Sequence, residues 1–129
     1  MSLELKLLAA AAVLGFVHLF AAAMTSTAQR GAAWNLGNRE GAPPLTGLAH
    51  RLDRAFANFR ETFPLFAVAV IVVSLGGKAG GLSVAGCAVY LIARALYLLV
   101  YALGIKGLRS LVWLIGTAGI FMVLAALVI

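Results

Sequence analysis

The stretch Arg51–Leu65 reads RLDRAFANFRETFPL and leads into a long apolar run. Four of its polar residues share one face of a helix, because they follow one another at offsets of 3, 7 and 10 residues. They are Arg51, Arg54, Asn58 and Glu61. A charged side chain at the centre of a bilayer helix costs about 2.5–3.5 kcal/mol on insertion scales. The stripe therefore indicates either a functional site or anchoring at the membrane interface.

The composition of the whole chain is that of a membrane protein. Of the 129 residues, 64% are hydrophobic and 11% are charged, and the mean hydropathy is +1.06. A soluble domain averages about 45–50% apolar and about 25% charged residues, and a chain of this size has no water-soluble core that would bury so much apolar surface. With about 20 apolar residues in each membrane span, the sequence predicts an all-α integral membrane protein with four spans, folded as a single domain over residues 1–129.

Glycine and proline residues divide the apolar segments. The predicted spans are residues 3–24, 48–75, 82–103 and 108–129, and the predicted loop is residues 25–47. That loop contains Pro43 and Pro44 together with several Gly and Asn residues, which interrupt helices and favour turns. The first span is longer than the usual signal-peptide core of 7–15 residues, so we expect it to be retained.

The net charge of +6 comes from cations at the predicted membrane ends rather than from a basic soluble face, so we expect no nucleic-acid partner. More Lys and Arg residues flank the long loop than the opposite side, which predicts a cytoplasmic loop and both termini outside. The loop-side cations are Arg30, Arg39, Arg51, Arg54, Arg60, Lys106 and Arg109, and those of the opposite side are Lys6 and Lys78.

A second polar stripe lies on the third span. It comprises Tyr90, Arg94, Tyr97 and Tyr101, which share one helical face because they follow one another at offsets of 4, 7 and 11 residues. Arg94 is too deep to reach either membrane surface easily, so it should point into the protein and find a partner there. Arg109 follows at the start of the fourth span.

The two stripes are expected at the same membrane depth, where they offer several guanidinium groups, one carboxylate, one amide and two phenols. This set suits a small zwitterionic or anionic ligand, since Arg binds carboxylates in a bidentate manner. Nearby cations also lower the pKa of a ligand thiol. The structural alternative is that Glu61 pairs with Arg94 or Arg54 while the remaining residues anchor the interface.

Two further residues in the spans are expected to have structural roles. We expect His18 to form a hydrogen bond with a neighbouring helix. Cys87 stands alone in an apolar segment and is expected to be a buried, inert thiol. No group of residues has the spacing of metal ligands, so no metal site is predicted.

Two segments resemble the signatures of one membrane-protein family. RAFANFRETFPLF, residues 54–66, resembles the RAxxNxxExxPxF signature of the MAPEG superfamily, the membrane-associated proteins in eicosanoid and glutathione metabolism. ARALYLLVYALGIKGLRSLVW, residues 93–113, resembles the ARxxYxxxY segment of that family and the Arg that follows it. The chain looks most similar to the short bacterial branch, which implies the bacterial inner membrane. Thr62 departs from the eicosanoid-making relatives, which commonly carry Tyr at that position.

The resemblance implies a four-helix bundle in each subunit, assembled as a homotrimer, with glutathione bound between subunits near the cytoplasmic side. A lipophilic substrate would reach the glutathione from the membrane lipid. Arg109 matches the Arg that stabilises the glutathione thiolate. The residues implied to bind glutathione are Arg54, Asn58, Glu61, Arg94, Tyr97, Tyr101 and Arg30.

These observations favour a glutathione-dependent transferase or peroxidase acting on hydrophobic electrophiles or lipid hydroperoxides. The alternative is a non-catalytic membrane module that binds a lipid or a small anion. A proton-coupled exporter is disfavoured, because such a protein needs a carboxylate deep in the membrane and Glu4 lies at the very end of the first span.

Overall fold

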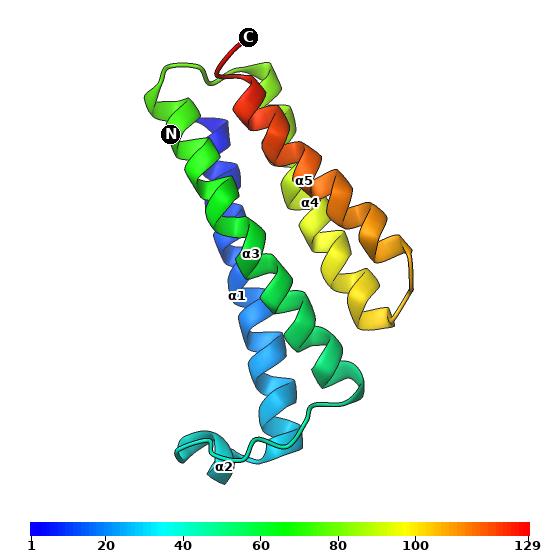
Figure 1. The fold of residues 1–129 in the computed structure, drawn as a ribbon. Coiled ribbons are helices and arrows are strands. Elements are labelled where there is room, and N and C mark those ends of the chain that lie inside the picture. The colour runs from blue at the N-terminus through cyan, green and yellow to red at the C-terminus, as the bar shows by residue number, and fades with distance from the viewer.

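The computed structural model describes all 129 residues as an all-helical bundle (Figure 1). Four long helices are accompanied by one short helix in the connection between the first two. The elements are α1 (Leu3–Arg30), α2 (Ala32–Leu36), α3 (Gly47–Leu75), α4 (Gly81–Leu103) and α5 (Leu108–Ala125).

All four long helices have the length and apolar composition needed to cross a membrane. The prediction of an all-α membrane protein with four spans is therefore confirmed. Figure 1 shows the two chain termini at one end of the bundle and α2 at the other. We call the end that carries α2 the loop end.

The predicted loop over residues 25–47 was too long. Helix α1 continues to Arg30, since the residues after Met24 contain no Gly or Pro, and it ends at Gly31 with a φ of +91°. Helix α2 occupies a further part of the expected loop. At the opposite end, α5 stops at Ala125 and a turn completes the chain, short of the span predicted to reach residue 129.

The side chain of Gln29 joins the end of α1 to the start of α3. Its amide nitrogen donates to the carbonyl of Thr46 at 2.8 Å, and its amide oxygen accepts from the Thr46 backbone N–H at 3.0 Å. Thr46 is the residue before α3. This pair of bonds fixes where α3 begins, and with it the position of the polar stripe that follows.

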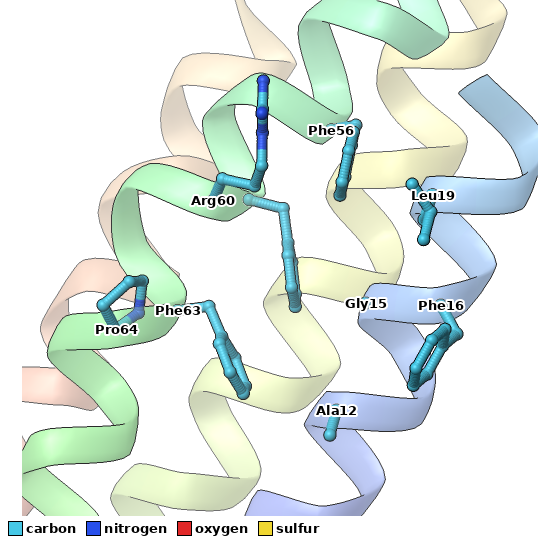
Figure 2. A pocket seen from close by; sticks show the side chains of 9 residues that line it. Ala12, Gly15, Phe16, Leu19, Phe56, Arg60, Phe63 and Pro64 are labelled. Atoms are coloured by element: carbon cyan, nitrogen blue, oxygen red, sulfur yellow. The ribbon is translucent and has the colours of Figure 1, made fainter. Parts of the chain in front are cut away.

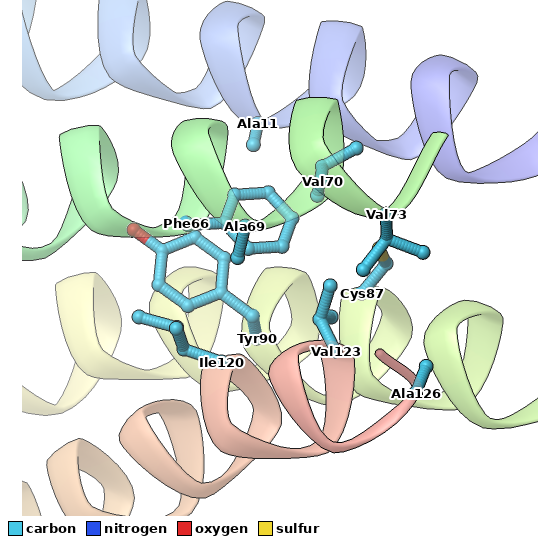
Figure 3. Packing of buried hydrophobic residues seen from close by; sticks show 10 residues of the cluster. All are labelled: Ala11, Phe66, Ala69, Val70, Val73, Cys87, Tyr90, Ile120, Val123 and Ala126. Atoms are coloured by element: carbon cyan, nitrogen blue, oxygen red, sulfur yellow. The ribbon is translucent and has the colours of Figure 1, made fainter. Parts of the chain in front are cut away.

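The bundle is built from two closely packed pairs of helices, α1 with α3 and α4 with α5, and α3 also packs against α4. The main core lies where these pairs meet (Figure 3). There the rings of Phe66 and Tyr90 stack with centroids 4.0 Å apart, and the Tyr90 hydroxyl lies 3.1 Å from the Thr62 hydroxyl. Cys87 is fully buried in the same core, as predicted.

Helices α4 and α5 approach each other through two glycines. A Cβ atom on Gly119 would lie 2.7 Å from the backbone oxygen of Gly86 and 2.8 Å from the backbone nitrogen of Tyr90. Neither backbone atom is free to move aside without shifting its helix. Small residues allow this close contact between membrane helices, where packing rather than the hydrophobic effect drives association.

We expect Gly119→Ala to destabilise the protein by about 1–3 kcal/mol, the usual cost of overpacking a tight core. The measurement is the thermal midpoint of the detergent-purified protein. Gly81→Ala is the matched control, because a Cβ atom there has no neighbour within 4 Å. An equal effect of the two substitutions would contradict the close contact.

Candidate functional site

The centre of the candidate site is a buried guanidinium. Arg94 on α4 is only 1% exposed, and its Nη1 donates to the Oδ1 of Asn58 on α3 at 2.8 Å. Its Nε and Nη2 are buried without a hydrogen-bond partner in the chain. The guanidinium carbon lies 4.4 Å from the ring centroid of Tyr97 and 5.7 Å from that of Phe59. Aromatic faces therefore supply the contacts that a carboxylate does not.

Two tyrosines connect this buried cation to a second, exposed one. Tyr97 and Tyr101 lie one turn apart on α4, with ring centroids 5.5 Å apart in an edge-to-face arrangement. The guanidinium carbon of Arg109, at the start of α5, lies 5.0 Å from the centroid of the Tyr101 ring. Arg94, Tyr97, Tyr101 and Arg109 thus form a continuous row of cations and phenol rings, which we call the Arg–Tyr row.

A cavity of about 420 Å³ opens beside the Arg–Tyr row. It is large enough for part of a small polar molecule and lies where α3, α4 and α5 meet. Its lining combines an amide, a phenol, a guanidinium and a hydroxyl with an indole and a leucine. The lining residues are Asn58, Tyr97, Arg109, Ser110, Trp113 and Leu114.

The other two predicted residues of α3 lie outside this cavity. Arg54 and Glu61 are both exposed on the surface of the single chain, and neither forms a side-chain hydrogen bond within it. The structure therefore brings Asn58 into the site and leaves its two stripe neighbours on an open face of α3. An exposed carboxylate on a membrane-spanning helix requires cover from another chain or a polar cavity.

Arg30 is placed away from the Arg–Tyr row. Its Nε donates to the carbonyl of Pro43 at 2.9 Å, and its guanidinium carbon lies 4.9 Å from the centroid of the Trp34 ring. It lines a different cavity, of about 490 Å³, together with Asp53. Within one chain, Arg30 is part of the corner between α1 and α2.

Two expectations about partners were wrong. The structural alternative paired Glu61 with a nearby Arg, but the partner of Arg94 is the Asn58 amide, and Glu61 is exposed. His18 was expected to form a hydrogen bond, yet both of its ring nitrogens are buried without a partner. Instead the imidazole stacks on Phe59, with ring centroids 4.8 Å apart.

Ser110 and Trp113 were not predicted to belong to the site. The available signal was helical spacing, because Trp113 lies four residues after Arg109 and so falls on the same face of α5. A Trp near a membrane end is usually an interfacial anchor. Helical spacing alone therefore does not distinguish a Trp113 that anchors the interface from one that lines the site.

An apolar cavity of about 500 Å³ lies on another side of the molecule, between α1 and α3 (Figure 2). Phe16 and Phe63 face it from opposite helices. Phe59 lines this cavity and also contacts the buried Arg94. One aromatic side chain thus separates an apolar space from the polar centre.

The sequence matches the model of the MAPEG family over residues 7–129, so the chain belongs to that family of membrane proteins. The family acts in eicosanoid and glutathione metabolism, and its members generally use glutathione. A comparison with functionally curated proteins found no match.

The Arg94–Asn58 bond gives a stability prediction. Asn58→Ala removes the only hydrogen-bond acceptor of a buried cation, and should cost about 1.5–3 kcal/mol, the range for hydrogen bonds to charged groups. Asn58→Asp keeps an acceptor and should be less destabilising. Chemical denaturation of the detergent-purified protein measures both variants. A wild-type midpoint for Asn58→Ala would contradict the role of this bond.

Proposed function

We propose that the protein is a glutathione-dependent transferase or peroxidase that acts on hydrophobic electrophiles or lipid hydroperoxides. The observation that carries this proposal is the cavity lined by Asn58, Tyr97 and Arg109 beside the buried Arg94. Glutathione carries two carboxylates, an ammonium and a thiol. A site with several guanidinium groups and one nearby carboxylate complements those charges.

The chemical role of Arg109 follows from its charge and position. Its guanidinium lies over the Tyr101 ring, and the residue lines the cavity and is exposed, so the guanidinium is free to turn toward a bound thiol. A cation beside the sulfur favours the thiolate, which is the reactive nucleophile. We therefore assign Arg109 the catalytic role, and Arg54, Asn58, Glu61, Arg94, Tyr97, Tyr101 and Arg30 the binding of glutathione.

Two reactions suit such a thiolate. In conjugation, the sulfur attacks an electrophilic carbon, a C–S bond forms, and the leaving group departs with the bonding electron pair or the electrons move into a conjugated acceptor. In peroxide reduction, the sulfur attacks the terminal oxygen and the O–O bond breaks. The lipid alkoxide then takes up a proton to give the alcohol, and a second glutathione converts the sulfenic acid to the disulfide and water.

The distribution of charge supports an oligomer in which the site is shared between chains. Arg54 and Glu61 are exposed on a membrane-spanning helix, where lipid contact is costly. A second copy that packs on this face would cover them. Arg30, which is remote from the Arg–Tyr row of its own chain, would then reach the site from a neighbour. We propose a homotrimer, the assembly often found in this family.

The membrane supplies the second substrate in this proposal. The apolar cavity between α1 and α3 offers a path for a lipophilic molecule from the bilayer toward the polar centre (Figure 2). The excess of Lys and Arg at the loop end supports a cytoplasmic loop and termini outside. We propose the bacterial inner membrane as the location, with glutathione entering from the cytoplasm.

Arg109→Leu tests the catalytic assignment. On addition of glutathione, the unmutated protein should show the ultraviolet absorption of a thiolate, and Arg109→Leu should lose it, because no cation remains to stabilise the sulfur. Binding of glutathione should persist in the variant, since the other residues still hold the tripeptide. Absence of the thiolate band in the unmutated protein would contradict thiolate chemistry.

Glu61→Gln separates the proposal from a non-catalytic module that binds a lipid or a small anion. A carboxylate that holds the ammonium of glutathione should matter for glutathione, so the glutathione-dependent rise in the thermal midpoint should shrink markedly. A phosphate group is anionic and would not bind a carboxylate, so binding of a lipid or small anion through its phosphate should be unaffected or improved in Glu61→Gln. Unchanged stabilisation by glutathione would contradict the role of Glu61.

A further inference from the structure

A further cavity, of about 400 Å³, lies at the loop end, where Tyr101 and Arg109 of the Arg–Tyr row form part of its lining. The first turns of α3 form one wall, and the last turn of α4 with the turn into α5 forms the other. Its polar lining is basic, and no acidic side chain lines it. The charged and polar side chains around it are His50, Arg51, Tyr101, Lys106 and Arg109.

Arg51 is held at this cavity by the backbone of α4. Its Nε donates to the carbonyl of Ala102 at 3.0 Å, which occupies the inner edge of the guanidinium. The two terminal amino groups form no hydrogen bond within the chain and stay available to a ligand. An Arg fixed on one edge is preorganised to present its other donors to an anion.

Gly104 lies beside the side chain of Arg51. It ends α4 with a φ of +73°, a conformation that glycine adopts without strain. A Cβ atom at this position would lie 3.7 Å from both Cδ and Nε of Arg51. The turn after α4 therefore packs against the side chain of Arg51 at ordinary van der Waals distance.

The cavity lies at the height where lipid head groups are expected. Helix α4 has 23 residues and is therefore about 35 Å long, slightly more than the hydrocarbon thickness of a bilayer. Its last turn accordingly reaches the polar surface layer. Lys106 in the following turn is exposed, so the basic groups gather at the membrane surface with no internal counter-charge.

We propose that this cavity binds the phosphate of an anionic membrane lipid, with Arg51 and Lys106 as its main contacts. Phosphate fits the arrangement, because a guanidinium binds two of its oxygens in parallel and an ammonium adds a point charge. The site does not depend on the thiol chemistry proposed above. It shares Tyr101 and Arg109 with that site, so a lipid phosphate bound there would also help to hold Arg109 in place.

The test compares two lipids that share acyl chains and a phosphate but differ in head group and net charge. The protein is purified in a nonionic detergent and titrated with phosphatidylglycerol or phosphatidylcholine of the same acyl chains, with bound lipid counted by native mass spectrometry. The unmutated protein should retain phosphatidylglycerol in preference to phosphatidylcholine. Equal retention of the two lipids would overturn the proposal. A parallel titration with glycerol 3-phosphate tests the source, and binding of this soluble ester as tight as that of the lipid would also overturn it.

Lys106→Gln is the principal variant, because its side chain is exposed and makes no hydrogen bond whose loss would unfold the protein. It should weaken phosphatidylglycerol binding roughly fivefold, and Arg51→Gln should weaken it roughly tenfold, consistent with the loss of charge-assisted hydrogen bonds. Lys78→Gln is the matched control, since it removes the same charge from an exposed turn at the opposite end. Wild-type affinity in Lys106→Gln, or an equal loss in Lys78→Gln, would contradict a specific site.

Discussion

The candidate site is organised around the hydrogen bond between Arg94 and Asn58. A guanidinium buried within a membrane bundle is costly unless neighbouring groups replace its contacts with water. Here a single amide oxygen and the faces of two aromatic rings do so. The bond also joins α3 to α4, and it sets the rotation of both helices. That rotation turns Asn58 and Tyr97 toward the cavity beside α5.

The tight glycine contact between α4 and α5 also helps to position the groups around Arg94. Gly116 on α5 faces Ala93 and Arg94, with a Cβ position 3.6 Å from the Cδ of Arg94. Small residues therefore bring α5 close enough for Arg109 to lie above the Tyr101 ring. The close packing of α4 against α5 therefore has two effects. It fills the apolar half of the bundle, and it positions the charged groups in the loop half.

Much of this arrangement was predictable from helical periodicity, since polar residues at helical spacing in apolar spans must face protein. The spacing placed Tyr90, Arg94, Tyr97 and Tyr101 on one face. The structure joins the last three in one row, whereas Tyr90 stacks on Phe66 in the core. The partner of Arg94 was not predictable, because Asn58 and Glu61 share one stripe and only the rotation of α3 against α4 selects between them. The hydrogen bond expected for His18 was also wrong, because no sequence pattern predicts that its imidazole stacks on Phe59.

The proposed chemistry requires that the cavity beside the Arg–Tyr row binds glutathione. Isothermal titration of the detergent-purified protein with glutathione and with S-hexylglutathione tests it most directly. Both ligands should bind saturably, with one ligand per chain. S-hexylglutathione should bind more tightly, because its alkyl chain would contact apolar side chains. Absence of saturable heat with either ligand would contradict glutathione binding at this cavity.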